Sequence, residues 1–401
     1  MGILDRFIGS PRDRFANDTL RIARRTPGVQ DARYDREAFA ITVRRPGGHE
    51  PIWIYLSNVY SECQGSGRAE RKERIDRLIR ILTEPQADEG WDSVRPKLRP
   101  VLRPATFGQA GVTGVVPPIS RSALPHLREL VVIDHPESMA YVAPARLDAW
   151  GVSADEVFDA AHANLERIAR ASLRRDWPDD PNTLVRMVDT GDAYFTSLLL
   201  APGWLAEVSE RMGAPVVAFV PDTNTVLLRG VPETGLSSLY ERAEREYGEA
   251  VRGLSPVGYV PGTGGRVVPY TPPADHPDHA AARRNQVLLA ATEYGAQTKW
   301  LTQQYERAGL DVFVAQLLAV AWPDEAPFTV ATWTDGITSL LPEAQFIVFV
   351  RNDVAGPRIP WQAVAELVDL RPEPLLVPAR YRVGHWPPPE VMDDLRERAA
   401  G

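Results

Sequence analysis

A β-hairpin followed by an amphipathic helix is predicted twice in the middle of this chain. In the first unit, two apolar runs between residues 130 and 142 flank a four-residue turn, and a helix is predicted from Ser153. In the second unit, two apolar runs between residues 216 and 228 flank another four-residue turn, and a helix follows from about Ser238. The pattern indicates an α+β fold in which repeated hairpin-plus-helix units form a mostly antiparallel sheet with helices on one face.

The two helices carry the same N-terminal signal. Ser153 is followed three residues later by Glu156, and Ser238 by Glu241, which is the spacing of a capping box. The two units are too far apart for a solenoid repeat and too few for an array. We therefore interpret them as related halves of one domain.

The length of 401 residues predicts two or three domains. A segment rich in proline and glycine, from Pro261 to Pro277, indicates a boundary or a long exposed loop. We expect an N-terminal helical and hairpin region at residues 1–104 and the duplicated hairpin-helix domain at 105–272. A separate C-terminal α+β domain is expected at 276–401.

The regions on either side of the duplicated domain also mix helices and strands. In the N-terminal region we expect a helix from Pro11 to about Thr26, strands at 32–34 and 39–43, and a helix over 54–63. In the C-terminal region we expect a helix from Ala280 to about Ala308, strands at 312–320, 328–333 and 346–350, and a helix over 360–368.

The composition limits the class of protein. A net charge of −8 argues against nucleic acid as a partner. The single cysteine, Cys63, excludes an intrachain disulfide and favours a reducing compartment. The first residues lack the apolar core of a signal peptide, and the longest apolar run, Val312 to Trp322, is shorter than the roughly 20 residues that span a bilayer. We therefore expect a cytoplasmic protein with no membrane span.

Several segments together resemble a known bacterial family. They are Ile54–Tyr60, Arg95–Pro100, Met139–Val142 and Pro215–Pro221. Over roughly residues 11–272 the chain is similar to the YtpQ-like uncharacterised proteins, domain-of-unknown-function family 1444. The resemblance implies the fold and implies no established activity.

The chain differs from the YtpQ-like pattern at one turn, and its C-terminal part resembles a second family faintly. Where that pattern implies an Arg-Asp pair after Pro221, this chain has Asp222-Thr223-Asn224, so a site shared with the family is not expected at that turn. The C-terminal part faintly resembles suppressor-of-fused-like domains through Thr334–Gly336, Leu341-Pro342 and Trp361.

Metal-binding and catalytic patterns are sparse. His276 and His279 have a spacing that places two imidazoles on one helical face, but zinc needs three or four ligands and no third histidine or cysteine lies near in sequence. A helix start with acidic caps accounts for the same residues. His162 and Glu166, one turn apart, are interpreted as a solvated pair. We therefore expect no bound metal or cofactor and assign no catalytic residue.

Two segments have residues suited to binding. Arg95, Arg99 and Arg103 each precede a proline, and this repeat predicts an extended basic strap that could grip an acidic partner surface. The same segment fits a connector fixed by Leu98, Val101 and Leu102. Asp189 and Asp192 could hold a cation or a polar ligand, and they also suit a plain hairpin turn.

The C-terminal region is rich in aromatic residues that dominate protein interfaces. Trp386, before three consecutive prolines, is the first candidate for an exposed interface residue. We predict a non-catalytic cytoplasmic module, adaptor or immunity-like, that binds another protein through its sheet edge or C-terminal domain. The alternative is a hydrolase whose carboxylates or histidines come from distant parts of the sequence. A pocket with facing carboxylates or histidines would favour the enzyme, and an exposed aromatic patch would favour the binding protein.

Overall fold

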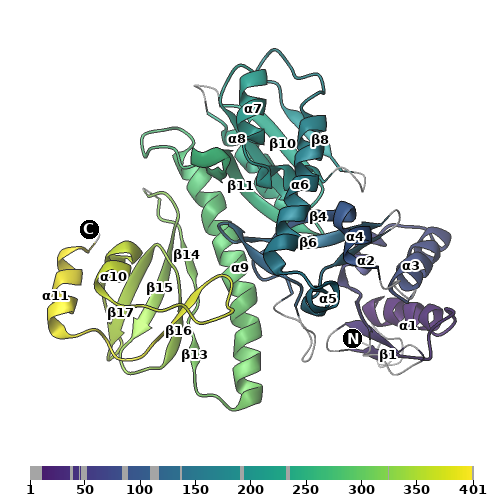
Figure 1. The fold of residues 1–401 in the computed structure, drawn as a ribbon. Helices are drawn as coiled ribbons and strands as arrows, with labels where there is room; N and C mark the ends of the chain where they lie inside the picture. Colours follow the sequence, from purple (N-terminus) through teal and green to yellow (C-terminus); the bar gives the residue numbers. More distant parts are fainter. Residues whose placement is uncertain are drawn as a thin grey trace. The chain divides into compact units, whose positions relative to one another are not determined.

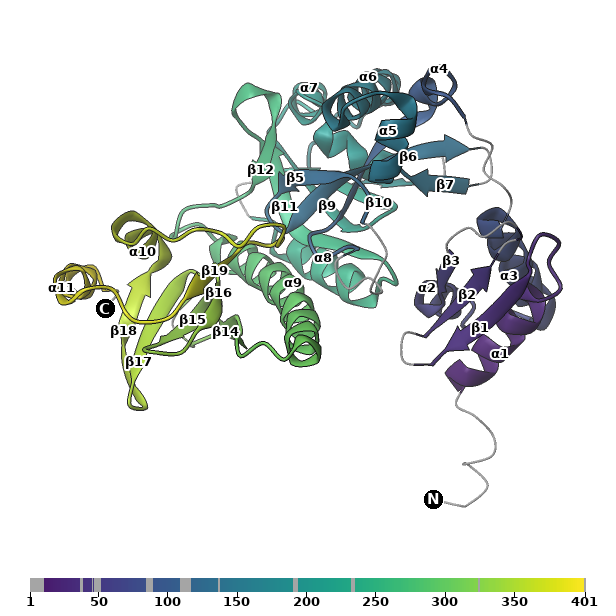
Figure 2. The ribbon, with the colours of Figure 1, turned by 60° about the horizontal axis from the view of Figure 1, so that its bottom comes forward.

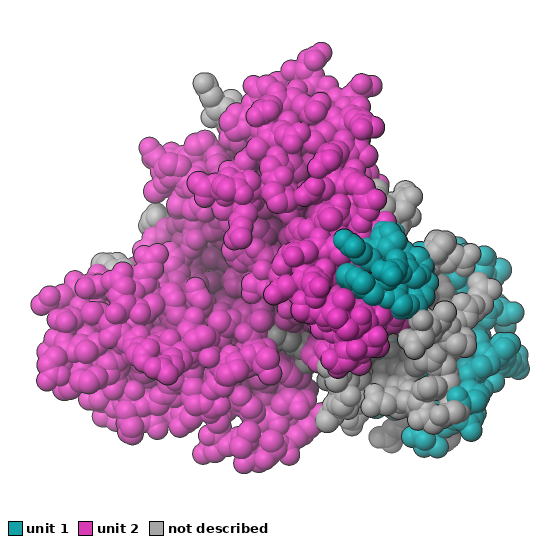
Figure 3. Space-filling view, in the orientation of Figure 1, with its two compact units in different colours: residues 1–97, 133–140 teal, residues 98–132, 141–401 magenta. Residues whose placement is uncertain are grey.

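The computed structural model describes residues 11–36, 39–44, 46, 52–83, 89–108, 117–135, 138–189, 194–231, 235–323 and 325–399. It confirms the α+β class, with several helices and mostly antiparallel sheets (Figure 1). The chain forms two compact units, residues 1–97 with 133–140 and residues 98–132 with 141–401, which Figure 3 colours separately. The division into three regions, with boundaries near 104 and 276, stays a prediction.

Unit 1 contains a three-stranded antiparallel sheet in the order β1-β2-β3. Helices α1 and α3 pack against it (Figure 2). Its elements are α1 (Pro11–Ala23), β1 (Asp31–Asp35), β2 (Ala40–Arg44), β3 (Ile52–Tyr55), α2 (Ser57–Glu62), α3 (Arg68–Thr83), α4 (Trp91–Val94) and the 3₁₀ turn η2 (Arg95–Lys97).

The helix expected over residues 54–63 is wrong at its start. Ile54 lies in strand β3 opposite Ile41 of β2, and the helix begins only at Ser57. Ile54 is buried in the core of unit 1, which a strand achieves by pointing alternate side chains inward. The β-branched isoleucines at 52 and 54 favour this extended conformation.

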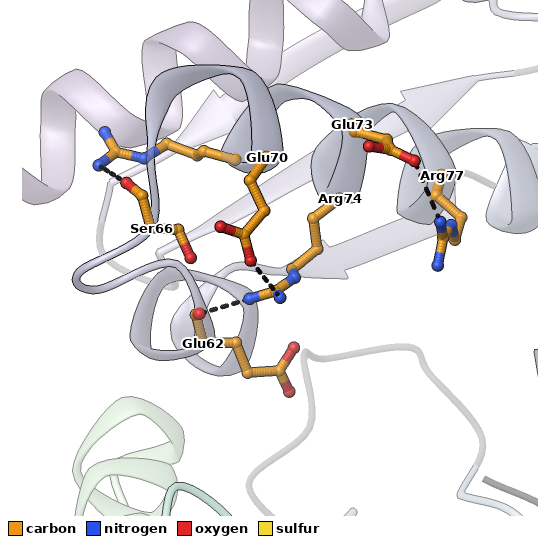
Figure 4. A network of polar contacts seen from close by, with 7 residues as sticks. Glu62, Ser66, Glu70, Glu73, Arg74 and Arg77 are labelled. Atoms are coloured by element: carbon orange, nitrogen blue, oxygen red, sulfur yellow. Dashed lines mark hydrogen bonds and ion pairs between the residues drawn. The ribbon is translucent and has the colours of Figure 1, made fainter. Parts of the chain in front are cut away.

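Charged residues along α3 are held by neighbours within unit 1 (Figure 4). Arg74 donates to the Glu62 carbonyl at the end of α2 and to the Glu70 carboxylate one turn earlier. Arg77 pairs in the same way with Glu73. These ion pairs are exposed and contribute little to stability. The bond to the Glu62 carbonyl matters more, because it satisfies an end group of α2 and ties that helix to α3.

The first of the two hairpins belongs to a four-stranded sheet, most of which lies in unit 2, whereas residues 133–140 of its strands β6 and β7 are counted with unit 1. The strand order of this sheet is β4-β6-β5, and β7 pairs with β6. Helix α6 packs on β4. The elements are β4 (Leu98–Pro104), β5 (Ser120–Leu124), β6 (Leu127–His135), β7 (Ser138–Tyr141), α5 (Pro144–Trp150) and α6 (Ala154–Ser172).

The second hairpin lies in a five-stranded antiparallel sheet with the order β12-β11-β9-β10-β8. Helix α8 covers one face, and α6 and α7 cover the other, as Figure 2 shows. The structure thus adds a second helical layer to the one expected. The elements are β8 (Val185–Val188), η3 (Phe195–Leu200), α7 (Trp204–Arg211), β9 (Val216–Asp222), β10 (Thr225–Gly230), α8 (Ser237–Glu249), β11 (Gly253–Pro261), η4 (Thr263–Gly265) and β12 (Val267–Pro269).

The uninterrupted apolar run of β9 explains the two covered faces. Val216, Ala218 and Val220 belong to the core shared with α7, whereas Val217 and Phe219 belong to the core shared with α8. Alternate residues of a strand point to opposite faces, so a strand that is buried on both sides needs apolar residues at every position.

Only one of the two expected capping boxes forms. The Ser153 hydroxyl accepts a bond from the Glu156 amide, and the Glu156 carboxylate binds the Ser153 amide in return, so this prediction is confirmed. Helix α8 instead has Leu236 as its N-cap, and the expected box from Ser238 to Glu241 is wrong.

A buried carboxylate replaces the missing box. The Leu236 amide donates to Asp278 Oδ1, and Asp278 is fully buried. Gly235, with φ of +87°, makes this approach possible, because a Cβ there would lie 2.7 Å from the same oxygen. A negative charge near a helix N-terminus is also favourable electrostatically.

The C-terminal part of unit 2 begins with the long helix α9, much as the sequence predicts. Two sheets follow, one with the order β14-β15-β17-β18 and one with the order β13-β16-β19. The elements are α9 (His279–Ala308), β13 (Phe313–Val314), β14 (Leu318–Val320), β15 (Phe328–Thr334), β16 (Ser339–Pro342), β17 (Phe346–Arg351), β18 (Val354–Pro360), α10 (Trp361–Leu367), β19 (Arg380–Val383) and α11 (Pro389–Glu397).

The strand expected over residues 312–320 is divided between the two sheets. Strand β13 pairs with β16, and strand β14 pairs with β15. At the break, the carbonyl of Ala315 accepts a bond from the guanidinium of Arg380. This contact depends on a residue far along the chain, so the local apolar pattern could not reveal it.

Arg380 is a buried cation at the centre of this part of the protein. It is 0% exposed and donates to Gln297 Oε1 (2.6 Å), Thr298 Oγ1 (2.6 Å) and the carbonyls of Ala315 (2.7 Å) and Leu340 (3.0 Å). Burial lowers its pKa to about 10, so the side chain stays charged at neutral pH. One side chain thereby ties α9 to both the β13–β14 break and strand β16.

We expect Ser153→Ala to lower the free energy of unfolding by about 1 kcal/mol, because it removes a formed cap. Ser238→Ala is the matched control and should change it by less than about 0.5 kcal/mol, as exposed substitutions usually do. Urea denaturation of both variants measures the difference. Equal effects would contradict the assignment of the two caps.

Arg380→Met should lower the free energy of unfolding by at least about 3 kcal/mol, since several buried acceptors lose their donor. Arg382→Ala, two residues away on the same strand, removes an exposed ion pair with Glu373 and should cost less than about 1 kcal/mol. Chemical denaturation compares the two. A small loss for Arg380→Met would show that the hydrogen bonds of this side chain stabilise the fold little.

Candidate functional site

The basic strap of the sequence analysis forms part of a sheet. Residues 95–97 make a 3₁₀ turn, and residues 98–104 form strand β4. Leu98, Val101 and Leu102 are buried, as the connector interpretation requires. Arg103 donates to Tyr141 Oη at 2.7 Å and to the Leu102 carbonyl, and Arg99 donates to the Leu98 carbonyl. Binding of an acidic partner by Arg95, Arg99 and Arg103 stays a prediction.

Asp189 has a structural contact at the end of strand β8. Its Oδ2 accepts the amide of Tyr194 at 2.5 Å, and its own amide donates to the Asn224 carbonyl at 2.8 Å. The carboxylate therefore orients the chain that enters η3. Asp192 lies outside the described residues.

The expectation that Trp386 is exposed is wrong. Its indole is half-buried in the C-terminal core, where Nε1 donates to the Trp333 carbonyl at 3.2 Å and the ring meets Phe349 edge-on. Arg351 lies 4.3 Å from the ring centroid. The Trp386 amide donates to Asp335, which lowers the pKa of that carboxyl. A buried indole N–H needs an acceptor, and the fold supplies one here.

His162 pairs with a residue that its sequence neighbourhood does not contain. Its Nε2 lies 2.6 Å from Oε1 of Glu129, a buried carboxylate on strand β6, and Arg121 donates to the other oxygen at 2.9 Å. Glu166 pairs with Arg170 instead, so the expected His162–Glu166 pair is wrong. The buried carboxylate of Glu129 is contacted by Arg121 from β5 and by His162 from α6, and these two contacts fix the helix on this sheet.

His276 and His279 serve the start of α9. His276 Nδ1 accepts the Asp278 amide, and His279 Nδ1 lies 2.9 Å from the Pro272 carbonyl. Across the described part of the chain, no three histidine, cysteine or acidic residues lie close enough together to hold a metal ion.

A cavity of about 580 Å³ lies within unit 2, where α9 meets the five-stranded sheet and the C-terminal strands. Its polar wall residues come from distant parts of the sequence. They are His126, Tyr259, Thr271, Arg283, Gln286, Thr329, Glu343, Gln345 and Gln362. Apolar side chains, among them Val287, Phe346 and Trp361, form the rest of the wall. Small-molecule sites typically have this size and this mixture of groups.

The titratable groups of the cavity are shifted by their surroundings. Burial lowers the pKa of His126 to about 4, and its Nδ1 has no hydrogen-bond partner among the described residues. Glu343 is exposed along the cavity, and the protein packed around its carboxyl raises its pKa. Burial lowers the pKa of Arg283. His126 is therefore neutral at pH 7, and Arg283 is charged.

A second feature is a set of exposed apolar side chains within residues 310–322 of the C-terminal part, here called the apolar edge: Leu310, Phe313, Leu318 and Trp322. Phe313 is 58% exposed and Trp322 is 47% exposed, and the other two are also exposed. Strands β13 and β14 are each the edge strand of their sheet. Large apolar side chains on an edge strand form a surface to which another chain can add.

The indole of Trp322 contacts an arginine and a phenylalanine that restrict its movement. Arg358 lies 4.4 Å from its ring centroid, and Phe328 meets it edge-on at 5.2 Å. Sequence reasoning found the tryptophan-rich region but selected Trp386. The sequence predicts one strand over residues 312–320, whereas the structure divides this run between the edges of two sheets and leaves Phe313 and Leu318 exposed.

Comparison with protein-family models, curated proteins and solved structures found no match for this chain. The resemblance to the YtpQ-like proteins therefore stays a prediction. No helix among the described residues is both long and apolar enough to cross a bilayer.

The neutral form of His126 predicts a pH effect on stability. Its pKa of about 4 in the folded protein lies below the ordinary value of 6.5. As the pH falls from about 6.5 to about 4, this histidine takes up a proton in the unfolded chain but not in the folded chain. The free energy of unfolding therefore decreases by up to about 3 kcal/mol over this range. Asn tolerates the positive φ of this position, so His126→Asn is the variant of choice.

We expect the unfolding free energy of His126→Asn to fall less steeply over this pH range than that of the unmodified protein. Urea denaturation at several pH values measures both curves. Parallel curves would show that His126 titrates normally in the folded protein.

Proposed function

We propose that this protein works by binding another protein through the apolar edge of its C-terminal part. The observation that carries the proposal is the exposure of Phe313 and Trp322 on and beside two edge strands. Tryptophan, backed by arginine and aromatic neighbours, is typical of residues that contribute most to protein interfaces. We also propose a cytoplasmic location, because the single cysteine suits a reducing compartment.

The geometry of the edge favours addition of an extended segment from the partner. Strand β14 has one neighbour, β15, in its sheet. A partner strand that pairs with β14 would form backbone hydrogen bonds, while Leu318 and Trp322 would contact its side chains. Because Arg358 and Phe328 already hold Trp322, less side-chain entropy is lost on binding.

The cavity gives less support to a hydrolase. Among the described residues that line it there is one histidine, His126, and one carboxylate, Glu343, and no hydrogen bond joins these two. A general base works best with a pKa near the working pH, and a histidine with a pKa of about 4 is a weak base.

Affinity purification from the organism that encodes the chain tests the proposal. The unmodified protein should capture a partner that the double variant Phe313→Ser/Trp322→Ala loses at least about tenfold, the size of effect expected for interface residues worth more than 1 kcal/mol each. Val354→Ser is the matched control, because Val354 is 70% exposed on β18, the opposite edge of the same sheet.

Titration of the purified partner against each variant then gives the dissociation constants. Thermal unfolding should show that the double variant remains folded. Equal capture by the unmodified protein and the double variant would contradict a role for this edge. Loss of capture by Val354→Ser alone would place the interface on the other edge.

A further inference from the structure

Arg283 is a half-buried cation on the wall of the cavity. Its Nη1 donates to Gln286 Oε1 at 2.8 Å, and its Nη2 donates to Gln345 Oε1. Both partners are neutral amides. Within the described residues, no carboxylate lies within ion-pair distance of this guanidinium, whereas the next residue, Arg284, pairs with Glu244 at 2.9 Å.

The two amide contacts leave part of the guanidinium available. A guanidinium has five N–H donors in a planar fork, and the contacts to Gln286 and Gln345 use two of them. The same contacts restrict the rotation of the side chain, so the remaining donors are pre-oriented. A carboxylate matches such a fork with two parallel hydrogen bonds.

The rest of the wall limits what the anion can be. His126 is neutral and adds no positive charge, and no lysine lines the cavity among the residues that the structure describes. Among the described wall residues Glu343 is the acidic one, and in its ionised form it repels a second negative group. A phosphate dianion is therefore a poor match. Val287, Phe346 and Trp361 supply contacts for an apolar body.

We propose that this cavity binds a small organic monocarboxylate with an apolar body, and that Arg283 is the residue that anchors its carboxylate. The site is separate from the apolar edge, since none of the four edge residues lines the cavity. Its occupation is therefore a second property of the protein, and it does not depend on the partner-binding proposal.

The test uses the full chain and a panel of aliphatic and aryl monocarboxylates of about 8 to 14 non-hydrogen atoms, a size that fits a cavity of this class. Each acid is paired with its primary amide, and inorganic phosphate is included. Ligand-observed NMR detects binding, and calorimetry measures affinity for the acids that bind. We expect several acids to bind, and their amides and phosphate to bind at least about tenfold more weakly.

Arg283→Gln should weaken binding of these acids at least about tenfold, because it removes charge-assisted hydrogen bonds to the carboxylate, which are stronger than bonds between neutral groups. Arg284 is the neighbouring arginine and does not line the cavity, so Arg284→Gln should leave the affinity for these acids unchanged. Glu343→Gln leaves Arg283 in place and removes the acidic group from the cavity wall. We expect this variant to bind dicarboxylates more tightly, relative to monocarboxylates, than the unmodified protein does.

Three results would overturn the proposal. They are the absence of binding by every acid of the panel, equal binding of acids and amides, and retention of full affinity by a folded Arg283→Gln variant. If Arg283→Gln does not fold, the proposal is tested by the ratio of dicarboxylate to monocarboxylate affinity in Glu343→Gln and in the unmodified protein. An unchanged preference between mono- and dicarboxylates would then count against the site.

Discussion

The packing of unit 2 depends on buried polar side chains along helix α9. Asn285 donates to the carbonyls of Tyr240 and Pro256, and Glu293 accepts both the amide and the hydroxyl of Thr106. One turn further, Gln297 accepts from Arg380. Apolar contacts are non-directional, whereas each of these bonds is satisfied in one arrangement only. The polar groups therefore fix how the helix docks against both the central sheet and the C-terminal strands.

This arrangement also determines the cavity. Arg283 and Gln286 lie within two residues of Asn285 on the same helix, so the bonds that hold Asn285 also position this part of the cavity wall. On the far side, Tyr294 accepts the Glu343 amide and donates to the Ala379 carbonyl. Glu293 is itself buried, so the residues packed around this part of α9 exclude water from its carboxyl, and this burial raises the pKa of Glu293. A cavity bounded by such a helix keeps its shape without a ligand.

The fold could be predicted where local sequence determines it. The hairpin around residues 221–224, the cap at Ser153 and the extent of α9 follow from turn residues, capping residues and periodicity. Local sequence patterns gave wrong helix starts and strand bounds where contacts with residues distant in sequence determine the structure. Asp278 replaces the cap expected at Ser238, and Arg380 divides the run over 312–320. In each case a charged side chain far along the chain supplies the contact.

The candidate sites were harder to predict for the same reason. Neither His126 nor Arg283 belongs to a recognisable motif, because a cavity wall built from several distant segments has no sequence signature. The apolar edge did leave a signal, the aromatic-rich C-terminal region. Which tryptophan is exposed depends on tertiary packing: Trp386 finds an acceptor in the Trp333 carbonyl, and Trp322 rests on Arg358.

The apolar edge and the cavity are joined by aromatic contacts. Phe328 meets Trp322 edge-on at 5.2 Å and Phe346 at 5.4 Å, and Phe346 lines the cavity. Contact alone does not couple two sites, because coupling requires that each ligand favour one of two arrangements of the residues between them. Arg358 lies over Trp322, Phe328 and Phe346 alike and holds them in one arrangement. Rigid packing of this kind favours two sites that bind independently, with the edge already formed when the cavity is empty.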